Sequence, residues 1–163
     1  MSAQARFDKN SSGLTQGNAA FVPTGNESPR VADSLWIYHV GLSCCGQEVE
    51  AAAGPRFDWE RMGCRIVEDH RNADVMFISG PVTPALVEEI QKIHREMRDP
   101  KFVVAVGSCA STGGMYSVDG KYQLKGLDAF VPVDLFIPGC APRPESLIHA
   151  LLRLQEKVGG VRA

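Results

Sequence analysis

The sequence predicts an α/β protein with an open parallel β-sheet covered by helices on both faces. Apolar segments of strand length recur without polar alternation, as expected for strands buried on both faces. Amphipathic segments of helical period and short connections alternate with them, and parallel neighbours require such crossover helices. With 163 residues, 44% of them hydrophobic, the chain can bury one sizeable core. We therefore expect a single α/β domain at residues 34–158.

Residues 1–33 differ in composition from the rest of the chain. They are mostly Ser, Gly, Asn, Gln, Thr, Ala and Pro, with isolated apolar residues and no sustained period. Such a segment buries too little apolar surface to offset its ordering entropy. We expect a flexible N-terminal segment, or one ordered on a partner through Phe21-Val22-Pro23, and a short C-terminal tail at residues 159–163.

The predicted strands begin just after this segment. The first, Leu35–Val40, is aromatic and β-branched and runs into Gly41. A helical turn is predicted at Glu48–Ala53, where Gly54-Pro55 ends it. Residues 56–62 fit a loop or a short amphipathic helix. Further strands are predicted at residues 64–67, 73–80, 101–107 and 133–137.

Two longer helices are predicted from capping and periodicity. Thr83 followed by Pro84 fits an N-cap with proline at the first helical position, and this helix extends to about Arg98. The second runs from Glu145 to about Val158. Their apolar faces are Leu86, Ile90, Ile93 and Met97 in the first, and Leu147, Ile148, Leu151 and Leu154 in the second. A polar hairpin or loop is expected around Asp119-Gly120.

Charge and hydropathy exclude several classes of function. The chain has 17 Lys and Arg against 19 Asp and Glu, a formal net charge of −2, so it offers no basic field for nucleic acid. It shows no signal peptide pattern and no uncharged apolar run long enough to span a bilayer. We expect a cytoplasmic protein without a transmembrane helix. Its 5 cysteines, an odd number without a secretion signal, favour metal or redox chemistry over disulfides.

Four of these cysteines follow predicted strands. Because ligands of parallel α/β sheets bind beyond the carboxyl ends of the strands, thiols from three segments are expected to converge at one edge. They are Cys44, Cys45, Cys109 and Cys140. Cys64 instead stands at the start of a predicted strand. We exclude it from the site and interpret it as a small, partly buried hydrophobic residue.

Four thiolates can hold either an iron–sulfur cluster or a structural zinc ion. Structural zinc commonly uses C-x-x-C pairs, which are absent here, and adjacent cysteines on a strand point to opposite faces. Gly41 and Gly46 allow the backbone to leave the strand conformation around Cys44-Cys45. Such differently directed thiolates fit the separate corners of a cubane cluster better than one tetrahedral ion. Zinc remains an alternative, and a vicinal disulfide is a third.

Several motifs carry a resemblance to a known family over about residues 34–158. They are Gly41–Cys45, Arg56–Asp58, Gly107–Ala110 with Gly113-Gly114, Val131–Asp134 and Pro138–Glu145. The chain resembles the NADH-quinone oxidoreductase 20 kDa (B) subunit family, which is related to the small subunits of energy-converting membrane-bound hydrogenases. The resemblance implies a flavodoxin-like fold and one 4Fe-4S cluster, the last in its electron chain, on Cys44, Cys45, Cys109 and Cys140.

The resemblance also implies a place in a larger assembly. In complex I-type members, the cluster reduces quinone in a chamber shared with a large catalytic subunit of the 49 kDa or hydrogenase-large-subunit type. A ferredoxin-like iron–sulfur subunit and ion-translocating membrane-arm subunits complete such complexes, and this subunit is peripheral on the cytoplasmic face. By motif, Glu48 is a candidate for a proton route. Arg56 is a candidate for orienting a polar group.

Some residues depart from the quinone-reducing pattern. Gly46-Gln47 replaces a more apolar pair, His70–Asp74 replaces Pro-Arg-Gln-Ala-Asp, and Gly80–Thr83 resembles the hydrogenase branch. Hydrogenase small subunits, however, normally separate their first two cysteines. The alternative function is therefore a small subunit of a ferredoxin-linked, hydrogenase-like or sulfur-reducing membrane complex.

Overall fold

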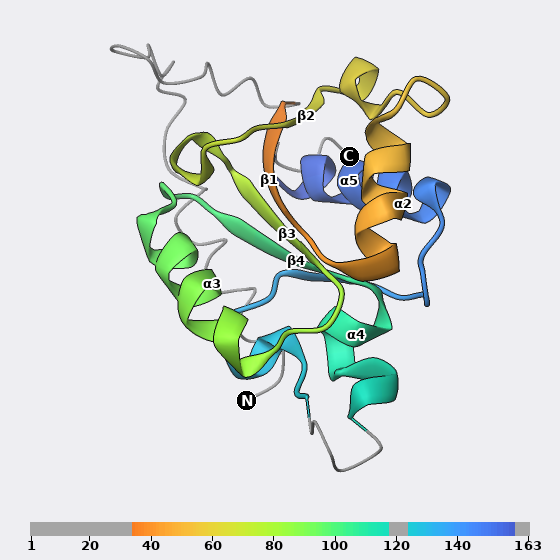
Figure 1. Cartoon of the computed structure of the whole chain (residues 1–163). Coiled ribbons are helices and arrows are strands. Elements are labelled where there is room, and N and C mark those ends of the chain that lie inside the picture. Colours follow the sequence, from red (N-terminus) through yellow and green to blue (C-terminus); the bar gives the residue numbers. More distant parts are fainter. Residues whose placement is uncertain (1–33, 118–123, 159–163) are drawn as a thin grey trace.

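Five parallel strands form one sheet in the computed structural model, which describes residues 34–117 and 124–158 (Figure 1). The strands are β1 (Leu35–Gly41), β2 (Cys64–Ile66), β3 (Val75–Ser79), β4 (Phe102–Val106) and β5 (Leu135–Ile137). Their order across the sheet is β2-β1-β3-β4-β5. This is the flavodoxin-like order, in which the chain reverses its direction of growth between β1 and β3. The predicted fold class is confirmed.

Helices cover both faces of the sheet. The longer ones are α2 (Ser43–Ala53), α3 (Pro84–Glu96), α4 (Gly107–Thr112) and α5 (Pro144–Val158). Short 3-10 helices are η1 (Trp59–Met62), η2 (His70–Asn72), η3 (Gly114–Tyr116) and η4 (Leu127–Ala129). Helices α2 and α5 lie on one face of the sheet and α3 on the other, while α4 lies at one end of β4 (Figure 1).

The two central strands explain the apolar runs in the sequence. β3 and β4 pair from Val75 opposite Phe102 to Ser79 opposite Val106, and every residue of both strands is buried. Alternate side chains enter the two cores: Phe77 and Val104 pack with α2 and α5, whereas Met76 and Val103 pack with α3. Strands covered on both faces have no solvent-facing positions, so polar alternation disappears.

The helix that carries Cys44 and Cys45 begins earlier than predicted. The sequence indicated a helical turn from Glu48, but α2 starts at Ser43. Ser, Cys and Gly are weak helix formers, so local propensity gave no sign of this first turn. The predicted helix from Pro84 is confirmed, and it ends at Glu96 rather than near Arg98.

The last strand is shorter than predicted. β5 begins at Leu135, although the apolar run starts at Val133. The side chain of Asp134 accepts a hydrogen bond of 2.8 Å from the backbone N–H of Val103, so a carboxylate takes a donor that the strand backbone would otherwise use.

Some expectations fall on residues that the structure does not describe. The N-terminal segment 1–33, the loop around Asp119-Gly120 and the tail at residues 159–163 lie outside the described ranges. Among the described helices, none is both long and apolar enough to cross a membrane.

Candidate metal centre

The structure brings four cysteines to the carboxyl edge of the sheet. Cys44 and Cys45 lie in the first turn of α2 after β1, Cys109 lies in α4 after β4, and Cys140 follows β5. Their thiols are close enough for the charge on one to act on another. Cys44, Cys109 and Cys140 each disfavour ionisation of Cys45. The convergence expected from the strand ends is therefore observed.

Burial divides the four thiols into two pairs. Cys45 and Cys109 are buried, whereas Cys44 and Cys140 are exposed. Burial raises the pKa of Cys45 to about 12, and the neighbouring thiols, Cys44 first, add to this effect. Burial also raises the pKa of Cys109, with further contributions from Cys140 and Cys44. A positive centre among these sulfurs would remove the cost of ionising them, because ligating thiols are deprotonated.

A sharp change of backbone direction separates the adjacent cysteines from β1. Leu42 is extended, with φ −124°, and Ser43 adopts a left-handed φ of 62°, which is uncommon for a residue with a side chain. Helix α2 begins there. Successive residues of a helix point about 100° apart, so Cys44 faces outward while Cys45 faces the core. The predicted departure from strand conformation is confirmed.

The loops that carry the other two cysteines are joined directly. The backbone N–H of Ser108 donates to the carbonyl oxygen of Gly139 at 2.8 Å, and the Ser108 hydroxyl donates to the same oxygen at 3.1 Å. Gly107 has a left-handed φ of 82°. A methyl group added at Gly107 would lie 2.5 Å from Cys45 Sγ. Three cysteine-bearing segments therefore meet at Gly107.

The donor set at this edge is all sulfur. Cysteine thiolates are the usual ligands of 4Fe-4S clusters, and left-handed glycines let the backbone pass close to the sulfurs. Within residues 34–117 and 124–158, no group of three or more His, Cys, Asp or Glu side chains is arranged to hold a metal ion. What fits the four cysteines to an iron–sulfur cluster is their residue type and their shared edge of the sheet.

Cys64 lies at the other edge of the sheet, where β2 begins. It is 1% exposed, so it is fully buried rather than partly buried as predicted. Burial raises its pKa to about 12. The side-chain amide of Gln155 donates to its sulfur at 3.5 Å and to the carbonyl oxygen of Met62 at 2.6 Å. These contacts give Cys64 a packing role.

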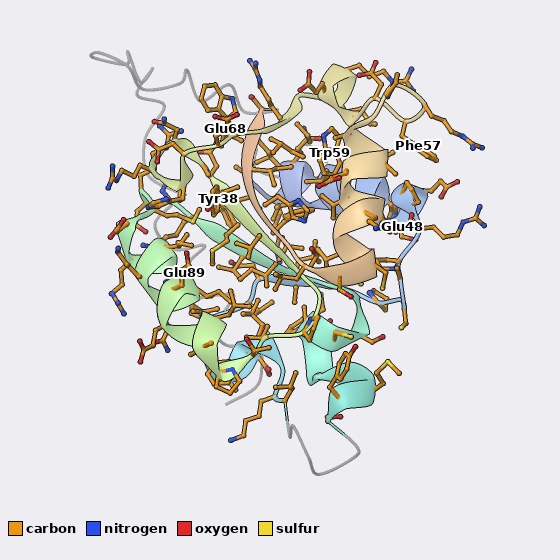
Figure 2. All side chains as sticks on the ribbon, in the orientation of Figure 1. Tyr38, Glu48, Phe57, Trp59, Glu68 and Glu89 are labelled. Atoms are coloured by element: carbon orange, nitrogen blue, oxygen red, sulfur yellow. The ribbon has the colours of Figure 1, made fainter. Side chains whose placement is uncertain are left out.

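Glu48 and Arg56 occupy different positions relative to the cysteines. Glu48 lies one helical turn after Cys44 on α2, is half-buried, and is drawn on the outer side of that helix (Figure 2). Arg56 is exposed on the loop after α2, with its guanidinium 5.4 Å from the ring centroid of Phe57. An 11-residue helix spans about 16 Å, so Arg56 lies beyond the end of α2 that is far from Cys44.

Sequence reasoning missed a polar pair beneath α2. His39 Nε2 lies 2.9 Å from the hydroxyl of Ser79, which is completely buried. The two residues come from neighbouring strands, β1 and β3. In the sequence, His39 and Ser79 are polar residues within two separate apolar segments. That pattern does not reveal that their side chains face each other.

Comparison with known proteins places this architecture in a family. Residues 43–154 match the family model described as NADH ubiquinone oxidoreductase, 20 Kd subunit. The chain is 45% identical to the NADH-quinone oxidoreductase (B) subunit of Clostridium beijerinckii, over 78% of this chain and 75% of that protein. It is 42% identical to the corresponding protein of Amoebophilus asiaticus, over 77% and 78% respectively.

A solved structure supports the same relationship. A chain of the membrane-bound sulfane sulfur reductase, an archaeal respiratory membrane complex, superposes with a TM-score of 0.72 at 36% identity. The match covers 81% of this chain and 74% of that one. From the family match and these identities, this chain belongs to the NADH ubiquinone oxidoreductase 20 kDa subunit family.

Proposed function

We propose that this chain carries the terminal 4Fe-4S cluster of a complex I-type respiratory complex and passes its electrons to quinone. Family membership makes it a subunit of an electron-transferring oxidoreductase complex. The observation that carries the proposal is the convergence of Cys44, Cys45, Cys109 and Cys140 at the carboxyl edge of the sheet. In the proposed role these four thiolates are the cluster ligands.

The chain's own residues prepare this site in two ways. Cys45 and Cys109, which are buried, hold the cluster against the protein core, and Cys44 and Cys140, which are exposed, lie on its outer side. The N-terminal N–H groups of α2 lack intrahelical partners, so they are free to donate hydrogen bonds to the sulfurs of a bound cluster. The cluster, when bound, supplies one-electron transfer.

The exposed side of the site indicates where partners would bind. Cys44 and Cys140 are exposed, so a cluster bound by them would lie at the surface of this subunit. A partner must therefore cover the cluster to keep water from the reacting quinone. The proposed partners are the large catalytic subunit, a ferredoxin-like subunit that delivers electrons, and membrane-arm subunits that translocate ions. In this assembly the chain is peripheral, on the cytoplasmic face of the membrane.

Glu48 and Arg56 are proposed as residues of the acceptor side. A carboxylate one helical turn from Cys44 can accept or deliver a proton as an acceptor near the cluster is reduced. Arg56, held over Phe57 at the surface, can donate hydrogen bonds to a polar group of a partner or of quinone.

A second candidate acceptor is a sulfur compound. It is favoured by the 36% identity and TM-score of 0.72 to a chain of a sulfane sulfur reductase complex. In that case the same cluster would pass electrons to an active site in the large partner subunit. Glu48 would then take part in proton transfer to the reduced sulfur compound instead of to quinone.

Reoxidation of the reduced complex by different acceptors tests this proposal. The complex that contains this chain is reduced with dithionite, freed of excess reductant, and mixed with a short-chain quinone or with polysulfide. We expect quinone to reoxidise the terminal cluster within a catalytic turnover, and polysulfide to do so far more slowly. The reverse order would assign the chain to the sulfur-reducing alternative.

A further inference from the structure

A buried hydroxyl ties the end of β3 to the turn that leads into Cys44-Cys45. Ser79 is 0% exposed, and its hydroxyl oxygen has polar neighbours on the opposite strand. It lies 2.9 Å from His39 Nε2, 3.3 Å from the carbonyl oxygen of Val40 and 3.3 Å from the backbone nitrogen of Leu42. The Leu42 N–H also donates to the backbone carbonyl oxygen of Ser79 at 3.0 Å, so it is shared between the two oxygens of that residue. One side chain of β3 therefore contacts the backbone on both sides of Gly41.

The proton positions in this group follow from its chemistry. The Leu42 N–H can only donate and the Val40 carbonyl can only accept, whereas a hydroxyl has one proton and two lone pairs. If Ser79 donates to Val40 and accepts from Leu42, its remaining lone pair requires a donor. His39 supplies that donor when its proton is on Nε2, and all three contacts of the hydroxyl are then hydrogen bonds.

Two glycines make room for this pair. A methyl group at Gly41 would lie 2.9 Å from His39 Cε1, and one at Gly46 would lie 3.4 Å from the Ser79 hydroxyl. The methyl at Gly46 would also lie 3.3 Å from the backbone of Gly41. Gly41 therefore leaves room for the imidazole on its own strand, and Gly46 lets α2 approach the backbone of Gly41 and the hydroxyl of Ser79.

We propose that His39 and Ser79 are positioning residues for the cluster: Nε2–H of His39 orients the Ser79 hydroxyl, which together with the Ser79 carbonyl oxygen fixes the Leu42 peptide and thereby the directions of Cys44 and Cys45. This inference rests on the proposed function, because it concerns a cluster held by those two thiolates. The Ser79 hydroxyl acts through backbone groups only. Glycine at residue 46 suits this arrangement, since a methyl group there would press on the backbone of Gly41 at 3.3 Å.

The electrostatics of the pair agree with a neutral imidazole. Burial lowers the pKa of His39, and the carboxylate of Glu50, from α2, opposes this effect in part. In neutral solution the ring therefore carries one proton. A proton on Nε2 satisfies all three contacts of the Ser79 hydroxyl, and the proposal assigns it there.

Variants of the two residues separate positioning from packing. His39→Gln keeps an N–H donor at a similar reach, His39→Leu removes it, and Ser79→Ala removes the hydroxyl. The matched control is His94→Gln on α3, since His94 is also half-buried and its helix covers the other face of the sheet. Each full-length variant is isolated with its cluster for iron analysis, EPR of the reduced form and release of iron to a chelator.

We expect the loss of either hydrogen-bonding group to loosen the cluster without abolishing it. His39→Leu and Ser79→Ala should release iron about tenfold faster or more, as when groups that orient metal ligands are removed, and shift the EPR g values. His39→Gln and His94→Gln should resemble the parent protein. Parent-like spectra and iron release in both His39→Leu and Ser79→Ala would overturn the positioning role. A parent protein without any cluster would instead overturn the proposed function.

The tautomer of His39 gives a test that does not depend on how the variants fold. Nitrogen-15 NMR of the full chain distinguishes a proton on Nε2 from one on Nδ1. We expect Nε2–H for His39. A neutral ring with its proton on Nδ1 would make Ser79 the donor to His39 and would contradict the proposed arrangement.

Discussion

Gly107 lies so close to Cys45 that a methyl group on its Cα would be 2.5 Å from the cysteine sulfur. Real carbon–sulfur contacts are longer than this, so any side chain here must displace the thiol or the loop. The buried Cys45 and the loop that leads to Cys109 are therefore packed as one unit. The relationship makes Gly107 a sensitive probe of the cysteine site.

Gly107→Ala is expected to lose the cluster. Its left-handed φ of 82° costs a residue with a side chain about 1–2 kcal/mol, and the methyl group would also push Cys45 out of place. Gly63→Ala is a matched control, because Gly63 has the same φ of 82° but precedes β2 at the other edge of the sheet. Iron per chain should fall only in Gly107→Ala. Equal iron loss in the two variants would mean that backbone strain alone is responsible.

Cys140→Ser is expected to lose iron, whereas Cys64→Ser is expected to lose stability. Cys140→Ser should lose most of its iron, because a ligand is removed at the exposed side of the site. Cys64→Ser should keep its iron but lose about 1–3 kcal/mol of unfolding free energy, because a hydroxyl replaces a buried thiol. Iron analysis and denaturant titration measure the two effects. Iron loss from Cys64→Ser would contradict its exclusion from the site.

Glu48→Gln is expected to slow reduction of the acceptor while leaving the cluster unchanged. The amide keeps the size of the side chain but cannot carry a proton between the acceptor and water. Glu89→Gln serves as the control, since Glu89 is exposed on α3 and lies well apart from Glu48 (Figure 2). Turnover of the assembled complex and EPR of the reduced cluster are measured together. Unchanged turnover in Glu48→Gln would remove the carboxylate from the proton route.

The unfolding free energy is expected to rise with pH across the range in which buried histidines lose their protons. Burial lowers the pKa of His94, with Lys101 and Arg95 adding to this effect and Asp99 opposing it. Between this lowered pKa and about 6.5, the unfolded chain binds more protons than the folded one, so stability increases as pH rises. His94→Gln should flatten this dependence in denaturant titrations at about pH 5 to 8. An unchanged slope would mean that His94 is not the group responsible.

The sequence predicted the sheet well because its strands are apolar and bounded by glycine and proline. β3 and β4 were recognised on this basis, and their parallel pairing placed Cys109 at the same edge as Cys44 and Cys45. The exclusion of Cys64 followed from its place at a strand start. In such cases local composition and long-range packing favour the same structure.

Details that depend on side chains meeting across strands could not be predicted. The start of β5 is set by the Asp134 carboxylate reaching the Val103 N–H, and the start of α2 by a left-handed Ser43. The His39–Ser79 pair depends on the register of β1 and β3, in which His39 lies opposite Phe77 and Gly41 opposite Ser79. A single sequence does not specify that register.

Whether the four cysteines hold a 4Fe-4S cluster is decided by the iron and acid-labile sulfide content of the anaerobically isolated protein, with EPR after reduction by dithionite. We expect about four iron and four sulfide per chain, as in one such cluster, and a low-temperature EPR signal that appears on reduction. A colourless protein that contains zinc in place of iron, with no EPR signal after dithionite, would contradict the assignment.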